Sequence, residues 1–285
     1  MRILILGGTG MLGHQLHQHL SLCFPDTYST IRQCITNYKF DKLINNGNII
    51  ESVDATEFAV LTGVMKCVRP DVILNCIGVT KRRKASNEAI QAITLNALLP
   101  HLLAEWGRTN SAKVVNFSTD CVFDGKAGNY GDDSTTNAVD LYGKTKALGE
   151  IQGENALTLR SSFIGTELDI GSELLEWFLA QTGTVTGFKN AIYSGLTTLE
   201  LSRVIEKILV QYPDANGIYN VSSDPISKYE LLLLIRNKLR LNIEVIPDEN
   251  MKCDRSLNSS KFRQEFNYTP PSWHAMIDEL ANTIS

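Results

Sequence analysis

A short apolar run followed at once by clustered glycines constrains the fold of this chain most strongly. Residues 2–6 read Arg-Ile-Leu-Ile-Leu, which is typical of a strand buried on both faces. Glycines then satisfy G-x-G-x-x-G, and residues 11–22 have the pattern of a helix. Such a turn lets the backbone approach a dinucleotide pyrophosphate, which the helix N-terminus attracts. The cofactor contacts expected here are Gly7, Gly10, Met11, Leu12 and Gly13.

The first 160 residues alternate between strand-like and helix-like segments. Further strands are expected at 27–31, 49–53, 71–75, 113–118 and 156–160. Helices are expected at 57–68, 87–107 and 139–152. This alternation predicts an α/β fold with a Rossmann-type, doubly wound parallel sheet.

The pattern is looser after residue 160. Segments 197–200 and 227–230 have the spacing of capping boxes that open helices. Between those helices, residues 217–221 have the pattern of a strand that returns to the sheet.

Tyr142 and Lys146 lie one helical turn apart, so both side chains face the same way. An ammonium favours a phenolate, and we expect Lys146 to lower the pKa of Tyr142 towards neutrality. Such a tyrosine exchanges a proton with a substrate oxygen. Ser118 and Thr119 end a predicted strand, at the edge of the sheet where ligands bind. Taken singly, these motifs also suit an exposed helix and a turn, but together with the glycine turn they favour an active site.

These segments together resemble the extended branch of the short-chain dehydrogenase/reductase superfamily. Residues 118–125, 142–150 and 159–165 are similar to the dTDP-4-dehydrorhamnose reductase family, and segments 254–261 and 271–273 fit the same family. The resemblance implies an NAD(P)-dependent oxidoreductase. Its expected reaction is reduction of the C4 ketone of a nucleotide-linked 4-keto-6-deoxysugar, in deoxysugar and polysaccharide biosynthesis.

The resemblance also implies a division of the chain and of the catalytic roles. Residues 1–160 would form the NADP-binding domain and residues 161–285 a small α/β substrate lobe. Tyr142 would protonate the emerging alkoxide, and Lys146 would also bind the nicotinamide ribose. Thr119 would orient the ketone oxygen.

The expected substrate contacts are Ser118, Asp120, Cys121, Phe163 and Arg255. Phe163 stands where the family usually has Trp, which alters the shape of the pocket. Arg255 is a candidate for the diphosphate or the nucleotide, because guanidinium groups pair with phosphate oxygens.

Cys121 leaves a second function open. It stands where the reductases generally have Tyr, and it resembles the cysteine of bifunctional epimerase/reductases such as GDP-fucose synthase. A partly ionised thiol near the active-site lysine could move a proton at a neighbouring carbon, giving a 3,5-epimerase/4-reductase. The histidine partner of GDP-fucose synthase is missing, because no histidine lies between residues 160 and 200.

A non-catalytic NADP-binding regulatory subunit is the third possibility, because a fold does not fix a function. The intact Tyr142, Lys146 and Thr119 argue against it, since a protein that only binds needs none of them.

The end of the second predicted strand bears on the choice of cofactor. An acidic residue there binds the ribose of NAD, whereas an arginine accommodates the 2′-phosphate of NADP. The sequence offers Arg32 and no acid, so we expect NADPH, with NADH as the alternative. By resemblance, Asp54 would face the adenine. The cofactor contacts expected after the fourth strand are Cys76, Ile77 and Gly78.

Two further features have a functional and a structural interpretation. The four cations of Lys81–Lys84 could meet a diphosphate, although most basic runs are solvated. Asn96 could hold a water near Lys146, although an amide that packs a helix is the preferred interpretation.

Charge and cysteine content limit the remaining classes of function. The net charge of −4 gives no reason to expect nucleic-acid or membrane binding, and the apolar amino-terminal run is too short for a signal peptide. The six cysteines lack the paired spacing of a metal site, so no metal is expected. Buried thiols suit a reducing cytoplasm, and the expected partner is a nucleotide-sugar substrate. A homodimer is compatible with the sequence.

Overall fold

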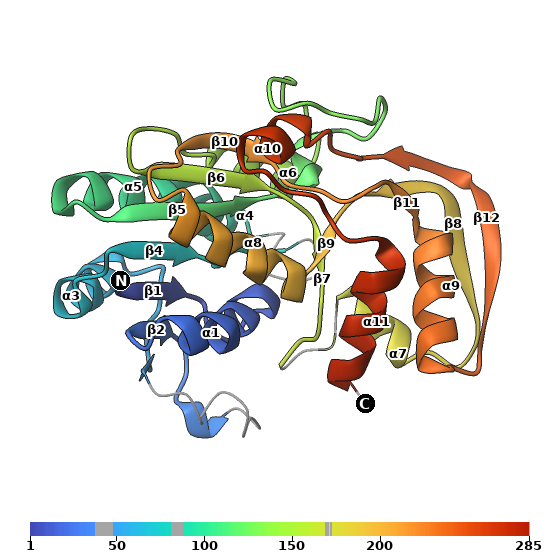
Figure 1. The fold of residues 1–285 in the computed structure, drawn as a ribbon, viewed down its shortest axis with the longest axis horizontal. Coiled ribbons are helices and arrows are strands. Elements are labelled where there is room, and N and C mark those ends of the chain that lie inside the picture. Colours follow the sequence, from blue (N-terminus) through green and yellow to red (C-terminus); the bar gives the residue numbers. More distant parts are fainter. Residues whose placement is uncertain (38–47, 81–87, 169–170, 172, 285) are drawn as a thin grey trace.

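The computed structural model describes residues 1–37, 48–80, 88–168, 171 and 173–284. Figure 1 shows a central sheet with helices on both faces and, beside it, a smaller lobe built around two long strands. The lobe is formed by the later part of the chain, drawn in yellow to red.

In the described part of the chain, the central sheet contains seven strands, and every pair of neighbours is parallel. Their order is β10-β6-β5-β4-β1-β2-β3. The strands are β1 (Ile3–Leu6), β2 (Thr27–Thr30), β3 (Ile49–Ile50), β4 (Val72–Asn75), β5 (Lys113–Ser118), β6 (Ala156–Arg160) and β10 (Gly217–Asn220). The expected doubly wound parallel sheet is therefore confirmed. β3 is shorter than expected because Ser52 has a φ of 59°, which ends the extended backbone.

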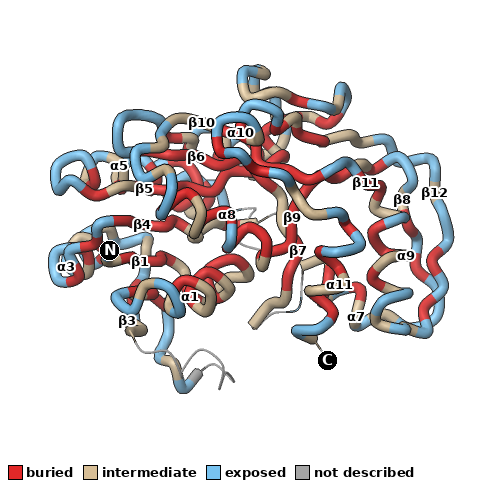
Figure 2. Tube along the Cα trace, viewed as in Figure 1, coloured by how far each residue is buried: buried red, intermediate tan, exposed pale blue. Residues whose placement is uncertain are grey.

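Successive residues of β1 serve two hydrophobic clusters on opposite faces of the sheet. Ile3 and Ile5 pack in the cluster that includes residues of α1 (Met11–Cys23) and α8 (Thr198–Gln211). Leu4 and Leu6 pack in the cluster that includes residues of α3 (Phe58–Val68) and α5 (Leu99–Asn110). All four side chains are fully buried, as Figure 2 shows for the central strands in red. This two-sided burial explains the uninterrupted apolar run.

The helix expected at 87–107 is a composite of three pieces. α4 (Ala89–Ala92) continues into a π-helical turn, η3 (Ile93–Leu98), and then into α5. Such turns widen a helix locally and often occur at functional sites. The turn presents Asn96 towards the loop that follows β4.

The helix that carries the Tyr-Lys pair, α6 (Leu141–Leu148), is shorter than the expected 139–152. It begins after Asp140, whose carboxylate accepts a hydrogen bond from the Gly143 N–H at 2.8 Å. This bond caps the helix and fixes its first turn. The helix ends at Gly149, where a Cβ would collide with the carbonyl oxygen of Asn96.

The smaller lobe adds strands that the sequence did not reveal. β8 (Gly183–Tyr193) pairs in parallel with β12 (Ile243–Asp254), and β11 (Ile226–Ser227) pairs antiparallel to β8. Many residues of β8 and β12 are exposed, so these strands lack the apolar run of the central sheet. The remaining elements are η1 (Ile35–Asn37), η4 (Asp120–Val122), β7 (Phe163–Ile164), α7 (Leu174–Leu179), β9 (Leu196–Thr197), α9 (Lys228–Leu239), α10 (Ser260–Glu265) and α11 (Trp273–Ile284).

Only one of the two expected capping boxes is complete within the described residues. The Ser227 side chain accepts from the Glu230 N–H, and the Glu230 carboxylate accepts from the Ser227 N–H. At α8, Thr197 accepts from the Glu200 N–H, but the Glu200 carboxylate instead accepts from the Tyr268 hydroxyl. The prediction of a complete capping box at residues 197–200 is therefore wrong.

None of the helices in the described segments is long and apolar enough to cross a membrane. The strand expected at 217–221 is present as β10, which pairs with β6. The boundary between two domains at residue 160 stays a prediction.

Candidate active site

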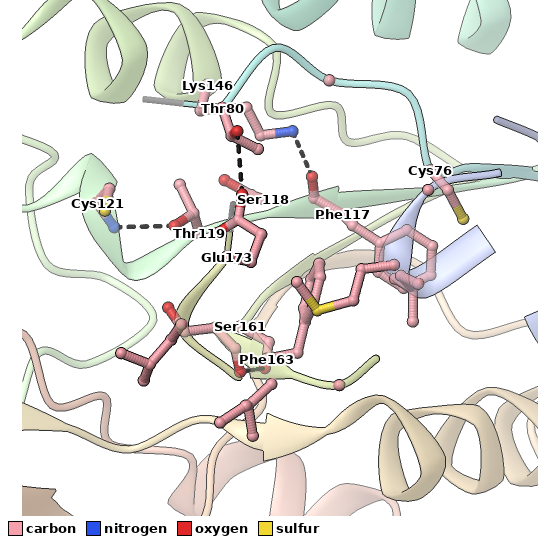
Figure 3. Close-up of a pocket in the computed structure, with 18 of the residues that line it drawn as sticks. Cys76, Thr80, Phe117, Ser118, Thr119, Cys121, Lys146, Ser161, Phe163 and Glu173 are labelled. Atoms are coloured by element: carbon pink, nitrogen blue, oxygen red, sulfur yellow. Dashed lines mark hydrogen bonds between the residues drawn. The ribbon is translucent and has the colours of Figure 1, made fainter. Parts of the chain in front are cut away.

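A cavity of about 310 Å³ opens where the carboxyl ends of the central strands meet the smaller lobe. Its central-sheet wall includes residues that follow β1, β4 and β5. Its opposite wall comes from the segment after β6 and from α7, β8 and α9. Figure 3 shows side chains from both walls turned towards one another. The lining residues predicted from the sequence are Gly10, Met11, Leu12, Cys76, Ile77, Gly78, Ser118, Thr119, Cys121, Tyr142, Lys146 and Phe163.

The glycine turn brings the start of α1 to the cavity. Gly7 has a φ of 85°, a left-handed conformation that glycine adopts without strain. A Cβ on Gly13 would collide with the carbonyl oxygen of Gly7, so the helix can lie this close to the strand only with glycine there. Gly7 and Gly13 therefore shape the turn, whereas Gly10, Met11 and Leu12 line the cavity.

Lys146 is buried in the cavity wall, with 7% of its surface exposed. Its Nζ donates a hydrogen bond to the carbonyl oxygen of Phe117 at 2.6 Å (Figure 3). Burial lowers the pKa of Lys146 to about 8, and the Glu150 carboxylate opposes that shift. The ammonium is therefore held at the end of β5, with its charge only partly stabilised.

Tyr142 behaves differently from the sequence-based expectation. Burial raises the pKa of Tyr142 above its ordinary value, and the neighbouring Cys121 adds to this, while a hydrogen bond with Thr119 opposes it. The expected lowering by Lys146 is wrong, because desolvation of the phenolate is the largest cause of the shift and raises the pKa. The phenol is therefore protonated at neutral pH, which is the form that donates a proton.

Thr119 organises the turn that begins η4. Its Oγ1 accepts from the Cys121 N–H at 3.1 Å and donates to Asp120 Oδ1 at 3.1 Å. Thr119 and Cys121 line the cavity, but Asp120 does not. Asp120 is instead buried beside Thr119. Its side chain does not line this cavity, so the predicted contact of Asp120 with the sugar stays a prediction.

Ser118 belongs to a buried ionic cluster that sequence reasoning missed. Its hydroxyl donates to Glu150 Oε1 at 2.7 Å, and Arg160 donates to both oxygens of the same carboxylate at 2.8 and 2.7 Å. Both side chains of this ion pair are nearly fully buried. A fixed carboxylate behind the strand end thus orients the Ser118 hydroxyl and partly opposes the lowering of the Lys146 pKa.

Asn96 joins two segments of the site. Its Oδ1 accepts from the Val79 N–H at 2.9 Å, and its Nδ2 donates to the Val79 carbonyl at 3.1 Å and to Thr145 Oγ1 at 3.2 Å. This amide holds the loop after β4 against α6, as expected of a packing amide. It thereby fixes Gly78 beside Lys146.

Besides Gly7, Gly13 and Asp120, three predicted binding residues lie outside the cavity wall. Arg32 and Asp54 are both exposed. Hydrogen bonds from Thr56 lower the pKa of Asp54, and Arg32 contributes through its charge. Arg255 donates from Nε to the carbonyl oxygen of Phe123 at 2.9 Å. Their binding roles stay predictions, and Lys81–Lys84 lies outside the described residues.

Several functional groups of the cavity, on both walls, were not revealed by the sequence. Thr80 donates to Glu173 Oε1 at 3.1 Å across the cavity (Figure 3). Tyr193 and Lys228 come from the lobe; Tyr193 belongs to no motif, and Lys228 lies within the capping box of residues 227–230 without a predicted role in the site. The buried Asn75 could have been found, because an amide inside an apolar strand needs a specific partner, which here is Asn116.

The whole chain matches a family model described as the RmlD substrate binding domain, over residues 1–285. The chain belongs to this family. The membership expected from the sequence motifs is confirmed.

Two relatives match the chain end to end. The dTDP-4-dehydrorhamnose reductase of Aggregatibacter actinomycetemcomitans is 25% identical over 306 aligned residues, covering 98% of each chain. The Escherichia coli K12 enzyme of the same name is 26% identical over 314 residues, covering 100% of this chain and 98% of that one. The RmlD fold is shared with the dTDP-4-dehydrorhamnose reductase of Bacillus anthracis, solved in complex with NADP. That similarity has a TM-score of 0.81 at 22% identity, covering 100% and 99% of the two chains.

Proposed function

We propose that this protein reduces the C4 ketone of a nucleotide-linked 4-keto-6-deoxysugar with NADPH, as its relatives named dTDP-4-dehydrorhamnose reductase do. The observation that carries the proposal is the convergence of Tyr142, Lys146 and Thr119 on one cavity that also contains the start of α1. The reaction serves deoxysugar and polysaccharide biosynthesis, and a relative at 27% identity is named a spore coat polysaccharide biosynthesis protein.

The residues around the glycine turn fit a dinucleotide. A Cβ on Gly13 would collide with the Gly7 carbonyl, so glycine at these positions lets α1 begin close against the end of β1. A helix N-terminus favours phosphate groups. NADPH, when bound, supplies the hydride that the C4 carbon accepts. We assign Arg32 to the 2′-phosphate and Asp54 to the adenine.

The chain's own residues supply the proton and the orientation. Reduction of the ketone needs one hydride at carbon and one proton at oxygen. Tyr142 gives that proton from a phenol whose raised pKa keeps it protonated until the alkoxide forms. Lys146 stabilises the resulting phenolate through its charge, and Thr119 orients the ketone oxygen.

The two alternative functions are less well supported. Cys121 lines the cavity, as an epimerase acid would, but the histidine partner is missing from residues 160–200. A regulatory subunit that only binds NADP would not need Tyr142 and the buried Lys146 together in the wall of an open cavity. We place the reaction in the cytoplasm, because none of the six cysteines, all of which lie in the described part of the chain, forms a disulfide.

Purified protein incubated in D₂O with NADPH and a panel of nucleotide-linked 4-keto-6-deoxysugars tests the proposal. The readouts are the loss of NADPH absorbance and the mass of the product. We expect oxidation with dTDP-4-dehydrorhamnose and no deuterium at C3 or C5 of the ring. Ring deuterium that disappears in Cys121→Ser would establish the epimerase/reductase instead. No oxidation with any sugar of the panel would refute the reductase.

A further inference from the structure

Lys228 brings a second positive charge to the cavity. Among the described residues of the cavity wall, only Lys146 and Lys228 have cationic side chains. Lys146 lies on the central-sheet wall, where its Nζ donates to the carbonyl oxygen of Phe117. Lys228 is the first residue of α9, is partly buried, and belongs to the opposite wall. The lobe therefore offers an ammonium that the proposed proton transfer does not use.

The fold holds the Lys228 side chain over an aromatic ring. Its Nζ lies 4.3 Å from the centroid of the Tyr193 ring. Tyr193 is buried, and the Trp273 ring packs against it with the two centroids 5.4 Å apart. The pairing of Tyr193 with Ile226 sets the start of α9 beside the end of β8. A cation–π contact of this kind restrains the lysine side chain before a ligand arrives, which lowers the entropic cost of binding.

Two carboxylates limit where an anionic group can lie in the cavity. Glu173 accepts a hydrogen bond from Thr80 at 3.1 Å, and Glu167 accepts from the Glu173 N–H at 2.7 Å. Both glutamates line the cavity, so its wall is mixed in charge. An anion therefore binds only beside an ammonium that outweighs the carboxylates.

The chemistry of the proposed substrate decides between the two ammonium groups. Lys146 lies one helical turn from Tyr142, where the ketone is proposed to react. The diphosphate of a nucleotide-linked sugar is attached at C1, across the pyranose ring from the C4 ketone. When the ketone faces the central-sheet wall, the C1 oxygen points towards the opposite wall, to which Lys228 belongs. Phosphate oxygens are strong acceptors for the N–H groups of an ammonium.

We propose that Lys228 binds the diphosphate of the nucleotide-linked sugar through charge-assisted hydrogen bonds. The assignment rests on the proposed function, because it takes the occupant of the cavity to be a nucleotide-linked sugar. It differs from the role predicted for Arg255, which donates to the carbonyl oxygen of Phe123 and does not line the cavity. The lobe thus holds the nucleotide end of the substrate, while the central sheet supplies the proton.

Lys228→Met removes the ammonium, keeps a long side chain, and tests the assignment by calorimetric binding. The probes are dTDP and dTDP-rhamnose, each added to the NADP-loaded protein at about 0.1 M and about 1 M salt. At the lower salt we expect the affinity for both probes to fall at least about tenfold, which is the scale of a hydrogen bond to a charged group. The difference from wild type should shrink at the higher salt, because ions screen a partly exposed pair. Lys228→Arg should keep most of the affinity, since a guanidinium also stacks on a ring and pairs with phosphate.

Lys252→Met is the matched control for the change in net charge. Lys252 is exposed on β12 and lies outside the cavity wall, so its loss should leave both affinities unchanged. Unchanged affinity for NADP in all variants would show that they are folded.

The outcomes separate this assignment from the proposed function. Equal affinity of wild type and Lys228→Met for dTDP would overturn the assignment and leave the proposed function intact. A loss for dTDP-rhamnose alone would also overturn it, since the contact would then be with the sugar, and so would an equal loss in Lys252→Met. A wild type that binds dTDP through Lys228 but reduces no nucleotide sugar would overturn the proposed function alone, and one that binds no dTDP would overturn both.

Discussion

Replacing Gly143 by alanine has two opposing effects on the free energy of unfolding, and their sizes can be compared. Gly143 lies in the first turn of α6, directly after Tyr142. Helix propensity alone favours alanine over glycine by about 0.5–1 kcal/mol. A Cβ there, however, would collide with the carbonyl oxygen of Cys121 and the side chain of Ala138. Because the carbonyl belongs to backbone, α6 must move, and such overpacking costs about 1–3 kcal/mol.

We therefore expect Gly143→Ala to lower the free energy of unfolding by about 1–2 kcal/mol. The displaced helix also carries Tyr142 away from Thr119, so kcat should fall more than the affinity for the cofactor. Gly63→Ala is the matched control, because Gly63 lies in the exposed interior of α3 and a Cβ there meets nothing within 4 Å. That control should gain about 0.5–1 kcal/mol and keep its activity.

Urea unfolding of the two variants and the wild type, with kcat measured on the same preparations, checks this reasoning. The midpoints should move in opposite directions with unchanged slopes. If both alanine variants were stabilised equally and both kept full activity, the close approach of α6 to the turn at Cys121 would be refuted.

Two further predictions concern buried ionisable groups. Burial against Ser29 lowers the pKa of His17 to about 4, so the unfolded chain takes up a proton that the folded chain resists. In urea titrations, the free energy of unfolding of the wild type should fall by about 2 kcal/mol from pH 7 to pH 5. The fall should be smaller in His17→Gln. An equal fall in the wild type and the variant would contradict this prediction. Glu150→Ala leaves the buried Arg160 guanidinium without its carboxylate and should cost about 3–5 kcal/mol in the same assay. Glu105→Ala removes an exposed ion pair and should leave the free energy of unfolding nearly unchanged. Equal losses of stability in Glu150→Ala and Glu105→Ala would contradict the prediction that the buried pair matters more.

The parts of the site that are local in sequence could be predicted from it. The glycine turn and the Tyr142–Lys146 pair need only a strand, a turn and a helix to acquire their geometry. The opposite wall could not be predicted in this way. Tyr193 and Lys228 meet only because β11 pairs with β8, and neither strand has the apolar run of the central sheet: β11 has only two residues, and many residues of β8 are exposed.

The error about the pKa of Tyr142 has a related cause. The sequence gives the spacing of two groups and hence their pairwise attraction, but not how much water each one loses. Desolvation raises the pKa of Tyr142 and lowers that of Lys146, and each shift disfavours the charged form. A protonated phenol beside a weakly basic ammonium still suits a reductase, because the charge forms only as the proton leaves.

The turnover of Tyr142→Phe with NADPH and dTDP-4-dehydrorhamnose tests the central claim most directly. The substitution keeps the ring and removes the proton donor, and Tyr219→Phe serves as the control for loss of a hydroxyl elsewhere. We predict a kcat at least about a hundredfold below wild type, with NADPH still bound. Undiminished turnover in Tyr142→Phe would contradict the assignment of this cavity as the site of proton transfer.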